Sequence, residues 1–222
     1  MKKKKVLVTG ASSDIGKAKA KDLATMGFHV VMACRNKDKA QVVRDAIVAS
    51  SGTTDISLFQ IDLASMASVR NGAEQILHAH PQIDVLINNA GGIFYERMLS
   101  VDGYEYTFAV NHLGHLLLTT LLLPALRKAG KARIINVSSI AHMFGHMQFE
   151  DLMFEKKYSP AKAYAMAKLA NVLFTYELDR RFRGQGITAN CLHPGVVNTN
   201  FFNSISSWQK KYFRSYLLWG LL

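Results

Sequence analysis

The stretch Val6–Gly16 (VLVTGASSDIG) decides the fold of this chain. A short apolar, β-branched run is followed by a turn with Gly10, and a helical pattern begins at Ile15. Free backbone N–H groups at a helix start attract an anion, and glycine allows the tight turn that such a site needs. The stretch therefore predicts a strand–turn–helix unit that binds phosphate.

The same alternation of apolar runs and amphipathic stretches continues along the chain. Six β-branched or apolar runs, most of them bounded by glycine, proline or polar residues, predict strands; they are Val6–Thr9, Val30–Ala33, Ile56–Ile61, Val85–Asn88, Arg133–Val137 and Thr188–Leu192. The stretches between them predict helices; these are Ile15–Met26, Lys37–Ala49, Met66–His78, Gly103–Lys128 and Pro160–Arg183. This order predicts an α/β fold, a three-layer doubly wound parallel sheet of Rossmann type, in a single domain over residues 1–222.

Composition sets the broad class. The chain has 222 residues, of which 49% are hydrophobic, which is enough for one substantial core. Cys34 and Cys191 lie at the ends of predicted buried strands and are expected to be free thiols in a reducing, cytoplasmic compartment. Lys2–Lys5 precedes an apolar run that is too short for a secretory signal. No run of about twenty apolar residues predicts a membrane span, and Leu116–Leu126 is interpreted as a buried helix.

The chain is basic, with a formal net charge of +11. Such a balance attracts nucleic acid, acidic lipid or a phosphorylated cofactor, or it describes a solvated basic surface. No long Lys/Arg run interleaved with aromatic residues occurs, so no nucleic-acid partner is expected.

Asp14 is the unusual residue of the phosphate turn. It stands where a middle glycine would let the backbone approach a pyrophosphate. A carboxylate about 4 Å from a phosphate would oppose binding by a few kcal/mol. Alternatively, Asp14 caps the helix, where its carboxylate is favoured by the free N–H groups and the helix dipole. Lys17, in the first helical turn, would offset part of the repulsion.

Arg35 follows the second predicted strand. An acidic residue at this place binds the ribose 2′-hydroxyl of an unphosphorylated dinucleotide, whereas an arginine pairs with a 2′-phosphate. Arg35 therefore favours NADP(H) over NAD(H), unless it is simply an exposed arginine. Asp62, after the third strand, is expected to accept a hydrogen bond from the adenine amino group or to cap the next turn.

Tyr164 and Lys168 lie one turn apart on a predicted helix and so share a face. A tyrosine has a pKa of about 10, and a nearby ammonium is expected to lower the pKa of Tyr164 toward usable acid–base chemistry. Ser139 would hydrogen-bond a substrate oxygen, and Asn111 would position a water that passes protons to Lys168. Each residue alone has an ordinary surface or capping role, but the ordered set predicts hydride transfer between a nicotinamide cofactor and a carbonyl or alcohol.

These motifs resemble those of the short-chain dehydrogenase/reductase family over nearly the whole chain. The matching positions are Thr9–Gly16, Asn88–Gly91, Asn111, Ser139, Tyr164 with Lys168, and Pro194–Gly195. Within the family, the retinol dehydrogenase group is the most similar, on the evidence of Asn111–His115, Val137–His142, Ala163–Phe174 and the wide interval between Ser139 and Tyr164.

The resemblance implies a function and a set of site residues. It implies an NADP(H)-dependent oxidoreductase acting on apolar aldehydes, ketones or alcohols of retinoid or lipid type, with Asn111, Ser139, Tyr164 and Lys168 as catalytic residues. Lys168 would also hold the ribose hydroxyls. The implied cofactor-binding residues are Thr9, Gly10, Ser12, Ser13, Ile15, Gly16, Arg35, Asp62, Leu63, Asn89, Ala90, Gly91, Tyr164, Lys168, Pro194, Gly195, Val197 and Thr199.

The chain departs from the family pattern in two ways. Asp14 replaces the middle glycine, and the chain ends before the usual last strand and the helix that precedes it, so the sheet is expected to lack that strand and to present an open edge. A second hypothesis therefore stays open, in which the chain is a C-terminally truncated, catalytically weak or inactive relative that acts as a binding protein.

Three further expectations concern partners. Residues 196–222 are expected to form a substrate lid, although the basic and aromatic tail Trp208–Leu222 is also compatible with contact to an acidic membrane surface. A homodimer through the helix that carries Tyr164 follows from the resemblance. His112/His115 and His142/His146 have metal-like spacings but no acidic or cysteine partner, so no metal is expected.

Overall fold

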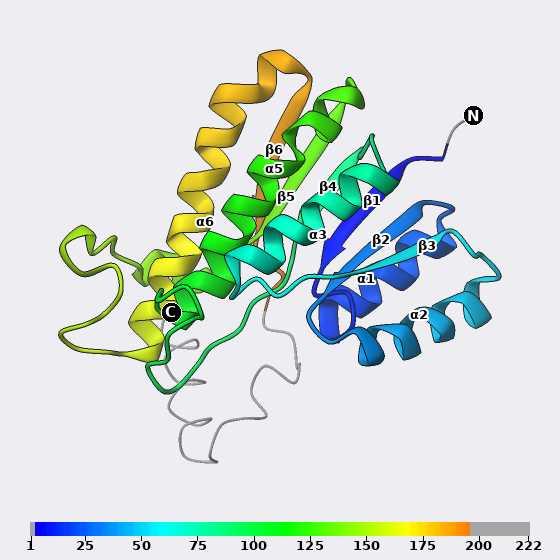
Figure 1. The fold of residues 1–222 in the computed structure, drawn as a ribbon. Coiled ribbons are helices and arrows are strands. Elements are labelled where there is room, and N and C mark those ends of the chain that lie inside the picture. The colour runs from blue at the N-terminus through cyan, green and yellow to red at the C-terminus, as the bar shows by residue number, and fades with distance from the viewer. Residues whose placement is uncertain (1–2, 196–222) are drawn as a thin grey trace.

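A computed structural model describes residues 3–195 of the chain. Six parallel strands form one sheet in the order β3-β2-β1-β4-β5-β6 (Figure 1). The strands are β1 Lys5–Thr9, β2 His29–Cys34, β3 Ile56–Gln60, β4 Val85–Asn88, β5 Ala132–Val137 and β6 Ile187–Leu192. The predicted Rossmann-type sheet and all six of its strands are confirmed.

Helices cover both faces of the sheet, because each strand alternates its side chains between two apolar cores. The helices are α1 Asp14–Thr25, α2 Lys37–Ser51, α3 Met66–Ala79, α5 Gly114–Lys128 and α6 Pro160–Phe182. Leu7 and Val31 face the core under α3, α5 and α6, which lie side by side in Figure 1. Val6 and Val30 face the other core, under α1 and α2.

The predicted helix Gly103–Lys128 is not uniform. Gly103 lies in a turn with φ +81°, and the helix begins at Tyr106 because the Glu105 carboxylate accepts hydrogen bonds from the N–H groups of Thr107 and Phe108, both at 2.8 Å. A short turn, α4 Tyr106–Phe108, leads into a π-helical segment, η1 Ala109–Leu113, and then into α5. Such π insertions are frequent at functional sites, and this one carries Asn111.

Together these segments form one long apolar helix, Tyr106–Lys128, of 23 residues. Its most apolar window has a mean hydropathy of 1.4, so the helix is long and apolar enough to cross a membrane. This differs from the expectation that no such stretch occurs. Within the fold, 56% of that window is buried. Leu118, Leu122 and Leu126 are fully buried in the core, as expected for Leu116–Leu126, whereas Leu116 is 38% exposed.

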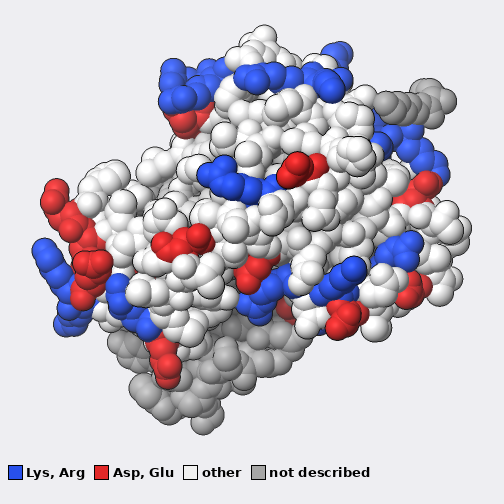
Figure 2. All heavy atoms as spheres, in the orientation of Figure 1, with Lys and Arg blue, Asp and Glu red and all other residues white. Residues whose placement is uncertain are grey.

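The basic residues are dispersed over the visible face of the molecule, with acidic residues among them (Figure 2). On α6, Glu177 accepts hydrogen bonds from both Arg180 and Arg181. Cations near the C-terminus of a helix are favoured by its dipole. This surface agrees with the interpretation of a solvated basic exterior.

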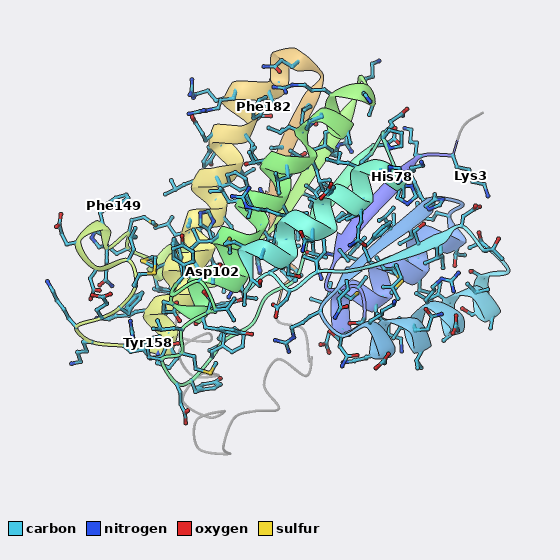
Figure 3. The ribbon with its side chains drawn as sticks, viewed as in Figure 1. Lys3, His78, Asp102, Phe149, Tyr158 and Phe182 are labelled. Carbon is cyan, nitrogen blue, oxygen red and sulfur yellow. The ribbon has the colours of Figure 1, made fainter. Side chains whose placement is uncertain are left out.

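The connection from β5 to α6 projects from the body of the molecule (Figure 1) and was not predicted as regular structure. It contains two 3₁₀ turns, η2 Ile140–Phe144 and η3 Phe149–Asp151. Figure 3 places Phe149 at its outer end, where the side chain is 74% exposed. Phe154 anchors the connection, because its side chain is only 1% exposed and packs with Phe108 and Met166. Its backbone has φ +50°, a left-handed value that is unfavourable for a bulky residue.

Candidate active site

The candidate site lies at the C-terminal edge of the sheet, where the strand order reverses between β1 and β4. Ligands of doubly wound sheets bind at this switch point. A cavity of about 520 Å³ opens there. It is lined by every predicted cofactor-binding residue within the described part of the chain, from Thr9 to Gly195. Val197, Thr199 and the expected lid and tail lie outside the described residues.

The phosphate turn forms as the sequence predicts, with one correction. Gly10 has φ +68°, and a Cβ on Gly16 would lie 2.2 Å from the Gly10 carbonyl oxygen, so both positions require glycine. The N-cap of α1 is Ser13, whereas Asp14 is the first helical residue and has φ +46°. Asp14 therefore does not occupy the N-cap position, although its carboxylate lies in the first turn of α1, where the helix dipole favours it. Asp14 occupies a left-handed position that suits glycine, and it lines the cavity.

Thr9 joins the phosphate turn to the turn after β4. Its hydroxyl oxygen accepts hydrogen bonds from the N–H groups of Asn89 at 2.8 Å and Ala90 at 3.0 Å. The Asn89 amide in turn donates to the Thr9 carbonyl at 2.9 Å. Two turns that are about eighty residues apart in the sequence thus form one wall of the cavity.

The far end of the cavity is positively charged. Arg35 and Lys39 both line it, and Asn36 caps α2 by accepting a hydrogen bond from the Lys39 N–H at 2.8 Å. The Arg35 guanidinium donates to the Tyr106 hydroxyl at 3.0 Å. Asp62 accepts from the Ala64 N–H at 2.9 Å, which is the local turn role that the sequence left open beside adenine binding.

Ser139, Tyr164 and Lys168 meet at the other end. Tyr164 is 7% exposed and Lys168 is 3% exposed, and the Lys168 Nζ lies 5.4 Å from the centre of the Tyr164 ring. Burial raises the pKa of Tyr164 to about 12, although the hydrogen bond with Ser139 lowers it in part. The expectation of a lowered tyrosine pKa is therefore wrong for the protein alone, because desolvation of the phenolate outweighs nearby polar groups. Burial also lowers the pKa of Lys168 to about 8.

Asn111 lies just behind this wall rather than on it. Its side-chain oxygen accepts from the Gly92 N–H at 3.1 Å, and its NH₂ group donates to the carbonyls of Gly92 at 2.9 Å and Thr107 at 2.7 Å. A Cβ on Gly91 would lie 2.4 Å from the Asn111 oxygen and 3.3 Å from the Lys168 Nζ, so both atoms flank Gly91. Lys168 itself donates to the Val137 carbonyl at 3.0 Å.

Several lining residues were not predicted from the sequence. Lys39 could have been found, because it lies one turn into the helix that follows Arg35. Ile93, Phe94 and Ile140 give the cavity an apolar part beside Ser139. Tyr106 does not line the cavity but contacts Arg35, and no local pattern could indicate this contact because the two residues are 71 positions apart in the sequence.

The arrangement of sheet, turns and Ser–Tyr–Lys cluster is that of the short-chain dehydrogenase family, and the chain belongs to this family. The family's sequence profile, described as short chain dehydrogenase, matches residues 4–210.

The more particular similarity is to retinol dehydrogenases. Retinol dehydrogenase 13 of Homo sapiens is 45% identical over 197 residues, which cover 88% of this chain and 60% of that protein. The chain spans about three fifths of the length of this and similar curated relatives.

Solved structures share the fold. An uncharacterized protein from Mycobacterium paratuberculosis has a TM-score of 0.78 at 39% identity, with 89% of this chain and 70% of that chain covered. A metagenomic short-chain oxidoreductase in complex with NADP has a TM-score of 0.71 at 27% identity, with 87% and 82% covered.

Proposed function

We propose that this chain is an NADP(H)-dependent oxidoreductase that interconverts apolar aldehydes or ketones and the corresponding alcohols. One observation carries the proposal: a single cavity extends from Arg35 at one end to Ser139, Tyr164 and Lys168 at the other. Membership of the short-chain dehydrogenase family and the similarity to retinol dehydrogenases support it.

The residues of the cavity fit a phosphorylated dinucleotide. The left-handed Gly10 and the start of α1 offer backbone N–H groups to a pyrophosphate. Arg35 and Lys39 would form the positive site for a 2′-phosphate, which supports NADP(H) over NAD(H). The bound cofactor would supply or accept the hydride.

Tyr164 is proposed to move the proton. Because burial raises its pKa to about 12, the phenol stays protonated near neutral pH and can donate to a carbonyl oxygen during reduction. Ser139 would hold that same oxygen, and Lys168 would stabilise the phenolate as the proton leaves. In the direction of oxidation, Tyr164 takes the proton back.

The substrate is proposed to be an apolar carbonyl or alcohol of retinoid or lipid-aldehyde type. Ile93, Phe94, Ile140 and Ala141 line the cavity next to Ser139, and these side chains offer little to a charged substrate.

The test is NADPH binding and turnover by the 222-residue chain. NADPH fluorescence titration is followed by a panel of retinal and medium-chain aldehydes, with Tyr164→Phe and the matched control Tyr176→Phe, an exposed tyrosine of the same helix. Tyr164→Phe should lose at least about 10²-fold in turnover and keep its NADPH affinity, whereas Tyr176→Phe should behave as the parent. Full turnover by Tyr164→Phe would refute the proposed acid.

A second function is a non-catalytic binding protein, and Asp14 is the observation that favours it. Asp14 lines the phosphate end of the cavity, and a carboxylate close to an incoming phosphate would repel it. If the parent chain binds no NADPH and Asp14→Gly does, this second function is supported. Turnover of the aldehyde panel by the parent excludes it.

Two proposals on partners remain. Leu116 on α5 and Leu173 and Tyr176 on α6 are exposed apolar residues, which supports a homodimer through the helix that carries Tyr164. Light scattering on the parent and on Tyr176→Glu tests this dimer. A cytoplasmic location with contact to an acidic membrane is the second proposal, and co-sedimentation with anionic liposomes at low salt tests that contact.

A further inference from the structure

His115 is a buried imidazole at the junction of three elements. It lies in the first turn of α5 and is 2% exposed. Its Nε2 is 2.9 Å from the hydroxyl oxygen of Thr9 at the end of β1. Its Nδ1 is 3.2 Å from the carbonyl oxygen of Asn111 in the π-helical segment. The proposed chemistry makes no use of this ring, although burying a polar group is costly unless it is hydrogen-bonded.

The two partners fix the tautomer of His115. The Asn111 carbonyl can only accept, so Nδ1 carries the hydrogen and Nε2 accepts from the Thr9 hydroxyl. The Thr9 hydroxyl has two acceptors within reach, the His115 Nε2 at 2.9 Å and the Ile87 carbonyl at 3.4 Å, and its hydrogen is assigned to the closer one. Its lone pairs face the N–H groups of Asn89 and Ala90. Burial is the main cause that lowers the pKa of His115 to about 3; the hydrogen bond with Asn111 opposes this shift, and nearby Lys168 and His112 add to it, so the ring is neutral.

The Asn111 carbonyl is held from a second side as well. The Asn171 side-chain NH₂ donates to it at 3.0 Å, and the Asn171 oxygen lies 3.0 Å from the Nδ1 of His112. The carbonyl is therefore contacted by side chains from both α5 and α6. The segment that carries Asn111 is bonded to the turn after β4 in two ways. The Asn111 side chain bonds Gly92 directly, and His115 links the Asn111 carbonyl to Thr9, whose hydroxyl oxygen accepts from Asn89 and Ala90.

We propose that His115 is a positioning residue that holds the Asn89–Gly91 turn and Asn111 at a fixed separation within one wall of the active site. This inference rests on the proposed function, because the separation matters only where a cofactor binds beside the turn. In fold terms, the ring connects the central strand to the π-helical segment. A defect in this connection would loosen the cavity wall without removing any group that touches cofactor or substrate.

Two substitutions of His115 separate the effect of its hydrogen bonds from the effect of its side-chain volume. His115→Leu keeps much of the volume and loses both hydrogen bonds, whereas His115→Gln keeps a donor and an acceptor. Thr120→Val is the matched control on α5, because the Thr120 hydroxyl bonds only to its own helix, at Leu116, among the contacts of the described residues. The readouts are amide hydrogen exchange of Asn89 and Ala90 in the cofactor-free chain, and the dissociation constant for NADPH.

His115→Leu should speed exchange at Asn89 and Ala90 at least about tenfold, leave the β2 amides unchanged, and raise the NADPH dissociation constant about tenfold. His115→Gln should recover most of both losses, and Thr120→Val should match the parent. Parent-like exchange in His115→Leu, or equal exchange in the leucine and glutamine variants, would overturn the proposal.

If His115→Leu fails to fold, nitrogen-15 NMR of the His115 side chain in the parent protein still tests the proposal. The expected signal is a neutral ring with the hydrogen on Nδ1 that does not titrate between pH 8 and pH 5. A ring with the hydrogen on Nε2, or one that titrates in this window, overturns the positioning role. Absence of NADPH binding by the parent refutes the proposed function instead, because exchange and NMR are measured without cofactor.

Discussion

Replacing Lys168 with methionine should make the cofactor-free protein more stable. The Lys168 side chain is 3% exposed, its Nζ donates to the Val137 carbonyl at 3.0 Å, and burial lowers its pKa from 10.5 to about 8. A lowered pKa means that the folded state accommodates the ammonium worse than the unfolded chain does. At about 1.36 kcal/mol per pKa unit, the penalty at pH 7 is on the order of 3 kcal/mol.

The pH dependence has a definite sign. The penalty is fully present below the folded-state pKa of about 8 and disappears as pH rises through the unfolded value of 10.5. About 1 kcal/mol of it remains near pH 9.5. Methionine removes the charge and leaves the Val137 carbonyl with one hydrogen bond fewer, which costs about 1 kcal/mol. The net gain is therefore about 2 kcal/mol at pH 7 and close to zero near pH 9.5.

The assay is urea unfolding of Lys168→Met and of the parent at both pH values, followed by circular dichroism. Lys162→Met is the matched control, because Lys162 is an exposed lysine of the same helix. The gain at pH 7 corresponds to a rise in Tm of roughly 4–8 °C for a chain of this size. A Lys168→Met protein that is no more stable than the parent at pH 7, or whose gain is the same at both pH values, would refute this reasoning.

Three further outcomes are expected. Arg35→Ala should weaken NADPH binding about ten- to a hundredfold and leave NADH binding within about twofold, because only the 2′-phosphate needs the guanidinium. Fluorescence titration with both cofactors measures this, and an equal loss of affinity for NADPH and NADH would contradict it. Asp14→Gly should tighten NADPH binding at least about tenfold, because it removes a carboxylate next to the phosphate site. The free energy of unfolding should change by less than about 1 kcal/mol, because relief of the strain at a left-handed φ is offset by the larger backbone entropy of glycine in the unfolded chain. An unchanged dissociation constant would show that Asp14 does not repel the phosphate. Phe154→Ala should cost about 3–5 kcal/mol in urea unfolding because it empties a buried aromatic position, whereas the exposed Phe149→Ala should stay within about 0.5 kcal/mol; similar losses at both positions would contradict the assigned anchor.

The sheet could be predicted from the sequence because its signals are local. Each strand is a short β-branched or apolar run, and the turn around Gly10 follows directly from the need for φ values that glycine adopts. The start of the long helix at Tyr106 could not be placed, because the apolar pattern continues back to Gly103 while the Glu105 cap decides the boundary. Hydropathy also carries no information on the change from α to π hydrogen bonding at Ala109–Leu113.

The sequence could predict which side chains gather at the site, but not the pKa values of those side chains. The spacing of Tyr164 and Lys168 indicates a shared helix face, whereas the pKa of Tyr164 depends on burial by segments far away in the sequence. His115 was considered only as a metal ligand, on its spacing from His112. Its partner Thr9 is 106 positions away, so no local pattern could indicate that hydrogen bond.

The position of β1 in the middle of the sheet affects how the protein is synthesised. Val6 pairs with Val30 on one side and with Val85 on the other, so the second neighbour of β1 is translated about eighty residues later. Until then, a nascent chain carries a strand with one open edge, which is a template for pairing with other chains. Contacts of such long sequence separation also form slowly. The ribosome-bound first half of this protein is therefore the stage at which we expect chaperones to matter most.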